Sequence, residues 1–313
     1  MYRIGVDLGG TNIAVGLVDE NNTILVKRSR PTNPKRSSEE IADDIVALCF
    51  EVCEGAGKSM SDVSNIGVAS PGIANCDSGE IEYTNNLPFR CFNICEYVRQ
   101  RTGVTNVALA NDANAAALGE AVAGAAKGTS SSVMITLGTG VGGGVIIDGR
   151  ILTGFSFVGG ELGHMVIEKN GALCSCGRRG CWEAYSSATA LIRMTREKIE
   201  EYRKAGKKTI MSEQERITGR TACDAMRAND EAGREVYEAY ISYLATGLTN
   251  IVNIFQPEVI SLGGGVSGEG QSLIDALLPL VHSEQYGRAH AKKAELKIAQ
   301  LGNDAGIIGA AAL

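Results

Sequence analysis

GVDLGGTNIAVGLVD, residues 5–19, is the stretch that decides the fold prediction. An apolar run ends at a turn rich in glycine, and a second apolar run follows it, which is typical of a β-hairpin. Residues 134–148, MITLGTGVGGGVIID, align with this stretch without a gap, and Asp19 falls on Asp148. A glycine-rich hairpin that occurs twice indicates two domains of related architecture.

Strands are expected to alternate with helices along the rest of the chain, which indicates an α/β fold. The 313 residues are enough for two domains. We expect a small N-terminal α/β domain of residues 1–118 plus a C-terminal helix at 303–313, and a larger C-terminal α/β domain at 119–302. We also expect the polar stretch up to Asn86 to be turn-rich, and residues 182–205 to form one long helix.

The overall composition excludes several classes of protein. A hydrophobic content of 44% and a charged content of 21% are ordinary for a soluble globular protein. The net charge is −6 and the basic residues are scattered, so the chain shows no basic footprint for nucleic acid. It has no apolar run of about 18 residues that could cross a membrane, and its first residues do not resemble a signal peptide. We therefore expect a reduced, cytoplasmic protein with neither nucleic acid nor membrane as a partner.

Three cysteines lie close together within residues 161–183, ELGHMVIEKNGALCSCGRRGCWE. Cys174, Cys176 and Cys181 follow His164 and complete a Cys₃His set, which is the donor set of a closed, tetrahedral structural zinc site. Free thiols and disulfides are the alternatives, but thiols stay reduced in the cytosol. The clustering therefore predicts a zinc site.

Three glycine-rich turns are expected to follow strands, at residues 9–12, 138–140 and 263–265. The backbone N–H groups of such turns can approach a phosphate closely. Taken singly, each turn is an ordinary hairpin, but together with the hydroxyls of Thr11 and Thr139 they favour nucleotide phosphates. The chain has no P-loop motif. A G-x-G-x-x-G pattern starts at Gly138 in the second turn, but the segment that follows it is expected to be a strand and not a helix. This argues against a dinucleotide-binding fold.

Two acidic positions follow expected strands. Asp7 lies immediately before the first turn, where a carboxylate either caps the turn or holds a hydrated Mg²⁺. Asn111 and Asp112 lie between a strand and an alanine-rich helix, where both residue types are favoured as helix caps. Alternatively, Asp112 is the general base of a kinase and Asn111 its orienting neighbour. The residues alone leave both alternatives open.

Short motifs are spread over the whole chain. They are DLGGTN at 7–12, SPG at 70–72, ND at 111–112, LGTGVGGG at 137–144, GGELGH at 159–164, CSCGRRGCWE at 174–183, LGGG at 262–265 and DAGIIGAA at 304–311. Together they resemble the ROK family of sugar kinases and sugar-responsive repressors, and most of all its bacterial ATP-dependent glucokinases. The resemblance implies a two-domain actin-like, hexokinase-type (ribonuclease H-like) α/β fold with a cleft between the domains, and a homodimer.

The resemblance also implies roles for the residues at matching positions. Asp112 would be the catalytic base, which accepts the proton of the sugar 6-hydroxyl as it attacks the γ-phosphoryl group of Mg-ATP. The residues implied to bind the sugar are Asn86, Asn111, Asp112, Glu161, His164 and Glu183. Those implied to bind ATP are Asp7, Gly9, Gly10, Thr11, Asn12, Thr139, Gly140, Gly264 and Gly265, and Asp7 would also lie beside magnesium. The implied ligands of a structural zinc are His164, Cys174, Cys176 and Cys181.

The sequence departs from the family pattern in the sugar loop. Many relatives carry Gly-Trp shortly after Asn-Leu-Pro, whereas this chain has Phe-Arg-Cys-Phe at residues 89–92. The leading interpretation is phosphorylation of glucose at its 6-hydroxyl. The alternatives are a kinase for N-acetylglucosamine, N-acetylmannosamine or fructose, and a non-catalytic sugar sensor, and polyphosphate stays open as a donor. The first expected strand begins at Tyr2, which leaves no room for the helix-turn-helix of the repressors.

Overall fold

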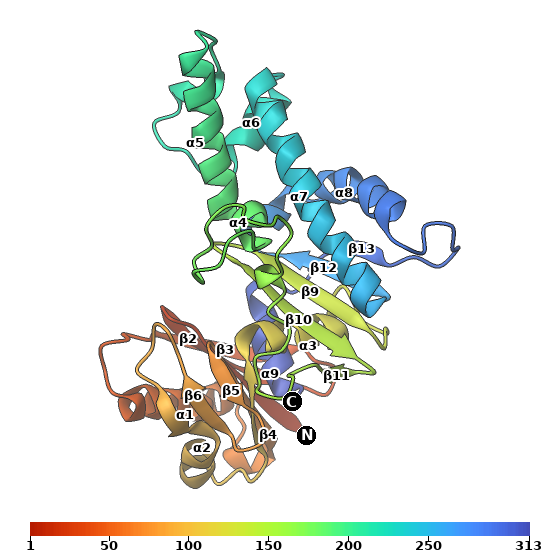
Figure 1. Cartoon of the computed structure of the whole chain (residues 1–313). Coiled ribbons are helices and arrows are strands. Elements are labelled where there is room, and N and C mark those ends of the chain that lie inside the picture. Colours follow the sequence, from red (N-terminus) through yellow and green to blue (C-terminus); the bar gives the residue numbers. More distant parts are fainter. The chain divides into compact units, whose positions relative to one another are not determined.

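The computed structural model describes every residue from Met1 to Leu313, and the chain folds into two compact units (Figure 1). The first unit consists of Met1–Met134, Gly144–Gly160 and Gln300–Leu313, and the second consists of Ile135–Gly143 and Glu161–Ala299. The domain limits expected from the sequence, at 118/119 and 302/303, stay a prediction. None of the helices combines the length and the apolar character that crossing a bilayer requires.

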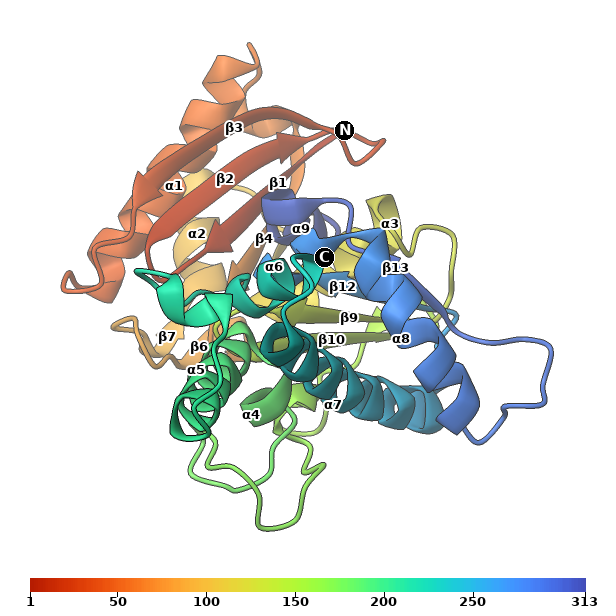
Figure 2. The same ribbon diagram turned by 90° about the horizontal axis from the view of Figure 1, so that it is seen from above.

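The first unit contains a five-stranded sheet in the order β3-β2-β1-β4-β8, part of which Figure 2 shows from above. Its strands are β1 (Tyr2–Leu8), β2 (Asn12–Val18), β3 (Ile24–Pro31), β4 (Val63–Ser70) and β8 (Val107–Asn111). Strands β1, β2 and β3 are antiparallel neighbours, whereas β4 pairs in parallel with both β1 and β8. The hairpin predicted for residues 5–19 is therefore confirmed.

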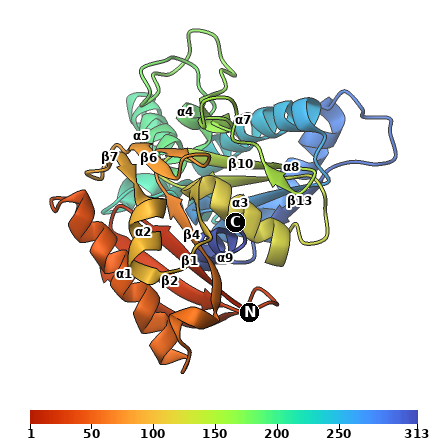
Figure 3. The same cartoon turned by 90° about the horizontal axis from the view of Figure 1, so that it is seen from below.

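Helices cover both faces of this sheet. Helices α1 (Ser38–Gly55) and α2 (Ile94–Thr102) lie beside one face (Figure 3). The core beneath them is built from alternating strand residues such as Ile4, Val6 and Leu8. The opposite face carries α9 (Ala305–Ala311), which also packs against α3 (Asp112–Ala123). A Cβ atom on Gly5 would lie 1.8 Å from the carbonyl oxygen of Ile307. The close approach of α9 therefore requires glycine in β1.

A small antiparallel sheet in the order β5-β6-β7 also belongs to the first unit. Its strands are β5 (Ile73–Asn75), β6 (Glu80–Tyr83) and β7 (Arg90–Asn93). The stretch up to Asn86 contains the expected turns, but it also contains β5 and β6, which were not predicted from the sequence. The strands have only three or four residues, and such short strands do not display the alternation that reveals longer ones.

The second sheet has the order β11-β10-β9-β12-β13. Its strands are β9 (Ser132–Leu137), β10 (Val141–Ile147), β11 (Arg150–Ile151), β12 (Val259–Gly263) and β13 (Glu295–Ile298). In both sheets the third, second, first, fourth and fifth strands follow one another in space, so the repeat seen in the sequence is a repeat of topology. The α/β fold class is confirmed.

Helices of the second unit surround the long helix α7 (Glu231–Phe255), which packs against α5, α6 and α8. The other helices are α4 (Glu183–Ser186), α5 (Ala188–Lys204), α6 (Thr221–Arg227) and α8 (Gln271–Glu284). Short 3₁₀ helices in the chain are η1 (Met60–Asp62), η2 (Leu162–His164), η3 (Ile210–Glu213), η4 (Gly265–Glu269) and η5 (Gly302–Asp304). The single helix expected at 182–205 was wrong: Ser187 is extended and accepts the N–H of Ala190, so it begins a new helix.

Candidate active site

Two carboxylates lie at the same edge of the first sheet. Asp7 pairs with Ala69 across β1 and β4, and Ala69 pairs with Ala110 of β8, two residues before Asp112. The pKa of Asp7 is raised to about 6, mainly by burial and also by the negative charge of Asp112, while Lys27 acts in the opposite direction. The structure therefore brings together the predicted magnesium ligand and the predicted catalytic base.

Asn111 caps helix α3 and leaves Asp112 free of that role. The Oδ1 atom of Asn111 accepts the N–H groups of Ala113 at 2.9 Å and Asn114 at 3.3 Å, and its Nδ2 donates to the carbonyl oxygen of Gly72 at 3.2 Å. The Oδ1 atom of Asp112 accepts the N–H of Ala113 at 2.8 Å. Burial raises the pKa of Asp112, and the hydrogen bonds from Ala113 and Asn111 only partly oppose it. The sequence alone left open which of the two residues caps the helix.

Replacing Asp7 by Asn is expected to stabilise the fold at neutral pH. The folded protein binds the Asp7 proton up to about pH 6, whereas the ordinary pKa is 3.8, so the wild type loses stability as the pH rises through this window. At pH 7.5, Asp7→Asn should raise the free energy of unfolding by about 1–3 kcal/mol, at ~1.4 kcal/mol per pKa unit. Below pH 4 the difference should vanish.

Urea unfolding at pH 7.5 and at pH 4 measures this difference. The matched control is Asp77→Asn, because the Asp77 side chain is exposed and should not change stability at either pH. Equal stability of Asp7→Asn and the wild type at pH 7.5 would contradict the prediction.

The first glycine turn, residues 9–12, is the tip of the β1–β2 hairpin. The N–H of Gly9 donates to the carbonyl oxygen of Asn12 at 2.9 Å, and Thr32 Oγ1 donates to the carbonyl oxygen of Gly9 at 2.7 Å. Gly10, Thr11 and Asn12 are exposed. The Gly9 N–H thus closes the turn, and the groups accessible to a ligand belong to the three residues that follow it.

Asn86 is exposed in the loop between β6 and β7. Arg90 fixes the end of this loop: its Nη1 donates to the carbonyl oxygen of Phe89 at 2.6 Å, and its guanidinium lies over the ring of Tyr83, 4.2 Å from the centroid. Phe89 is fully buried. Of the residues that depart from the family pattern, Phe89 therefore lies in the core, whereas Arg90 lies beside the loop together with Tyr83. No pattern in the sequence indicated this pair.

In the second unit, the turn between β9 and β10 (residues 138–140) carries Thr139, whose side chain is exposed. The N–H of Gly138 donates to the carbonyl oxygen of Gly140 at 3.0 Å. Thr189, near the start of α5, donates its Oγ1 hydrogen to the carbonyl oxygen of Thr139 at 2.7 Å. One hydrogen bond within the turn and one from α5 therefore fix its conformation.

The third glycine turn lies beside the second. Gly264 follows β12 with φ at 84°, and a Cβ atom there would lie 2.6 Å from the carbonyl oxygen of Leu137, the last residue of β9. A side chain is excluded at Gly264, whereas Gly265 has open space around it. The structure thus brings together two of the three turns predicted from the sequence.

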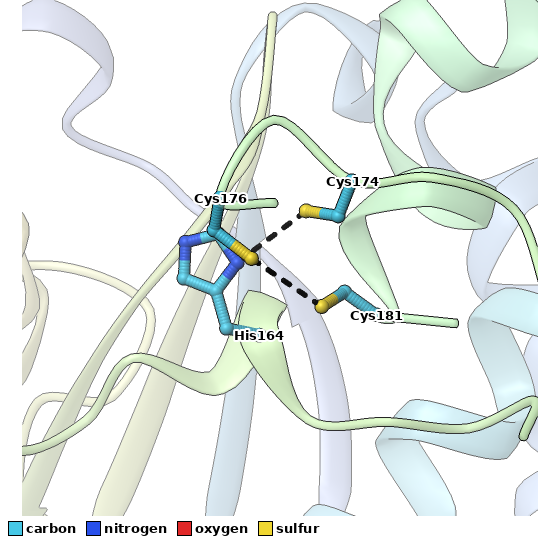
Figure 4. A group of neighbouring side chains, drawn as sticks. All are labelled: His164, Cys174, Cys176 and Cys181. Carbon is cyan, nitrogen blue, oxygen red and sulfur yellow. Dashed lines mark hydrogen bonds between the residues drawn. The ribbon is translucent and has the colours of Figure 1, made fainter. Parts of the chain in front are cut away.

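His164, Cys174, Cys176 and Cys181 converge, and Figure 4 shows the three sulfur atoms and the imidazole grouped together. One donor atom from each residue lies within 4.8 Å of all the others. The Cys174 sulfur is 3.6 Å from His164 Nδ1, and the Cys176 and Cys181 sulfurs are 3.7 Å apart. These four residues are placed to hold one metal ion, and because Nδ1 faces the sulfurs, Nε2 of His164 is left for another partner.

Tight backbone packing positions the loop that carries these donors. Gly180 has φ at 81°, and a Cβ atom there would lie 1.7 Å from the carbonyl oxygen of Glu168, so only glycine fits. Trp182, the only tryptophan in the chain, directly follows Cys181 and is fully buried. Glu161 is exposed, and its carbonyl oxygen accepts the N–H of His164 at 3.1 Å. Fixing His164 therefore also fixes the backbone of Glu161.

Glu183, the first residue of α4, uses both oxygens within the protein. Oε2 accepts the N–H of Val141 at 3.0 Å, and Oε1 accepts the hydroxyl of Ser175 at 2.8 Å. Ser175 was not predicted as a site residue, although its place between two of the cysteines was a signal that could have identified it.

The sequence profile of the ROK family matches residues 3–313. The chain belongs to the ROK family. A glucokinase from Thermotoga maritima is 36% identical over 311 residues, which are 99% of this chain and 96% of that protein.

Solved ROK structures resemble the whole chain. A ROK family glucokinase from Streptomyces griseus, in complex with glucose and AMPPNP, is 33% identical with a TM-score of 0.77, over 100% of this chain and 98% of that one. The ROK hexokinase from Thermus thermophilus is 33% identical with a TM-score of 0.82, over 99% of this chain and 97% of that one. These similarities confirm the prediction of an actin-like, hexokinase-type fold.

Proposed function

We propose that this ROK protein transfers the γ-phosphoryl group of ATP to the 6-hydroxyl of glucose, with Asp112 as the general base. The observation that carries the proposal is the largely buried Asp112 carboxylate. Asn111 caps the helix in its place, and burial raises the pKa of Asp112, in a chain related to glucokinases over its whole length. A carboxylate with a raised pKa is a stronger base, and it can take the alcohol proton as the oxygen attacks phosphorus.

The other residues predicted for this part of the site would bind the sugar. Asn111 would orient Asp112 and offer its second amide hydrogen to the sugar. Asn86, Glu161 and Glu183 would bind further hydroxyls, and His164 would donate from Nε2. A carboxylate has about four lone-pair sites, so Glu183 can accept a sugar hydroxyl while it keeps both hydrogen bonds described above.

For the nucleotide, we assign the phosphates to Gly10, Thr11 and Asn12 and to Thr139 and Gly140. The β12 turn, at Gly264 and Gly265, would lie beside the adenosine, and Gly9 would shape the first turn. Asp7 would hold the Mg²⁺ that accompanies ATP. Two carboxylates that repel each other at one sheet edge suit a hydrated divalent cation, which neutralises phosphate charge when bound.

The cysteine cluster fits zinc as a structural ion. With Zn–S bonds of about 2.3 Å and a Zn–N bond of about 2.05 Å, a tetrahedral site separates two sulfurs by about 3.8 Å and a sulfur from a nitrogen by about 3.6 Å. The observed separations are 3.7 Å and 3.6 Å. The ion would close the loop between His164 and Cys181 and would take no part in phosphoryl transfer.

A coupled assay of ADP release over a panel of sugars tests the proposal. We expect kcat/KM for glucose to exceed the values for N-acetylglucosamine, N-acetylmannosamine and fructose by about tenfold or more, because a site built to hydrogen-bond a given set of hydroxyls rejects analogues that lack them. Replacing ATP by polyphosphate in the same assay identifies the donor. A higher value for another hexose would correct the substrate, and no turnover with any sugar would instead support a sugar sensor.

The homodimer, which the family resemblance implies, and the cytoplasmic location, which was inferred from the composition of the chain, stay proposals. Light scattering of the purified protein measures the first directly, and a mass of about two chains is the expected result.

A further inference from the structure

The side chain of Glu183 connects two segments that are far apart in the sequence. On one side, Ser175 belongs to the loop of the cysteine cluster and donates to Oε1 at 2.8 Å. On the other, Val141 follows the β9–β10 turn and donates its backbone N–H to Oε2 at 3.0 Å. Hydrogen bonds to a charged acceptor are among the stronger ones in proteins. A single carboxylate therefore ties the cysteine cluster to the turn that carries Thr139.

The turn itself is shaped for this contact. A Cβ atom on Gly140 would lie 2.3 Å from Glu183 Oε2, which is too close for any side chain. The residue next to Thr139 must therefore be glycine for the carboxylate to reach the N–H of Val141. Thr139, Gly140 and Glu183 line a cavity of about 310 Å³ together with Cys174 and Ser175, so the carboxylate borders open space and is not packed away in the core.

Ser175 is the closer of two possible donors to Glu183 Oε1. The Cys174 sulfur also approaches this oxygen, at 3.5 Å, whereas the Ser175 hydroxyl lies at 2.8 Å. Because a thiol is a weak donor, the hydroxyl is the group that holds this oxygen.

We propose that Ser175 is a positioning residue that aims Glu183, and that this carboxylate couples the metal cluster to the β9–β10 turn. Loss of the metal, or of the Ser175 hydroxyl, then weakens nucleotide binding as well as sugar binding. The inference rests on the proposed function in one respect: the β9–β10 turn is taken to bind the phosphates of ATP.

The experiment compares Ser175→Ala with the wild type by calorimetric titration with the Mg²⁺ complex of AMPPNP, which requires no turnover. We expect the metal-to-protein ratio to stay unchanged and the nucleotide Kd to rise about 3–10-fold. This rise is smaller than the full loss of a hydrogen bond to a charged group would cause, because the effect on the nucleotide is indirect. The KM for glucose should rise by a similar factor, and kcat should change less than twofold. Ser175→Thr keeps the hydroxyl and should restore both constants to within about twofold.

Two controls separate positioning from general stability. Ser283→Ala removes an exposed hydroxyl that donates only to the carbonyl oxygen of Leu280, and it should leave every constant unchanged. Cys176→Ser should raise the nucleotide Kd at least as much as Ser175→Ala, because it releases the whole loop.

An unchanged nucleotide Kd in Ser175→Ala at full metal content, with or without a lower melting temperature, would overturn the inference. A wild type that binds AMPPNP but phosphorylates no glucose would overturn the proposed function, and the titration would still decide the role of Ser175.

Discussion

Asp112→Asn is expected to lower kcat by about 10²–10⁴-fold, the range over which a positioned general base accelerates a reaction. The amide has the same shape and can still accept the N–H of Ala113, but it cannot take up the proton of the sugar hydroxyl. Asn111 caps α3 through its own side chain, so the helix should begin normally in the variant. ADP release at saturating glucose measures kcat, and calorimetry measures the binding of glucose.

Sugar binding distinguishes a lost base from a damaged site. We expect the glucose Kd of Asp112→Asn to stay within about threefold of the wild type, because the other proposed sugar contacts remain. Wild-type turnover in this variant would remove Asp112 from the mechanism. A Kd that rises in step with the loss of kcat would show that Asp112 serves mainly to bind the sugar.

Cys176→Ser is expected to abolish metal binding and to raise the KM for glucose about tenfold or more. Removing one thiolate leaves an incomplete donor set, and the loop loses the constraint that places His164 and Glu183. Structural zinc sites contribute folding energy directly, so the variant should also unfold at a lower temperature. Metal content by mass spectrometry, KM and thermal unfolding measure the three effects.

The matched control for this variant is Cys76→Ser, because Cys76 is exposed like Cys176 but lies outside the cluster. Metal content, KM and melting temperature should all match the wild type in the control. If Cys176→Ser loses the metal and keeps the wild-type KM, the metal has no influence on the sugar site.

Several features of the candidate site were predictable because they depend on residues close together in the chain. The spacing of Cys174, Cys176 and Cys181 already limits how far apart their sulfurs can lie, and the predicted grouping with His164 is found. Likewise, a glycine turn between two apolar runs is a local pattern, and both hairpins occur where the sequence repeat indicated them.

Other features were not predictable because they depend on partners supplied by distant segments. Asn111 and Asp112 are both good helix caps by residue type, and only the observed hydrogen bonds show that Asn111 takes this role. The contact between Glu183 and Val141 spans 42 positions, and no residue pattern encodes it.

The sequence by itself determined the repeated β-hairpin, the α/β fold class and the grouping of His164 with Cys174, Cys176 and Cys181, since these follow from periodicity and short spacings. Only the tertiary structure decided that Asn111 and not Asp112 caps the helix, that burial raises the pKa of Asp112, and that Ser175 and Val141 hold Glu183. The physical reason is that a pKa and a hydrogen-bond partner depend on the three-dimensional surroundings of a group, which neighbouring residues in the chain do not specify.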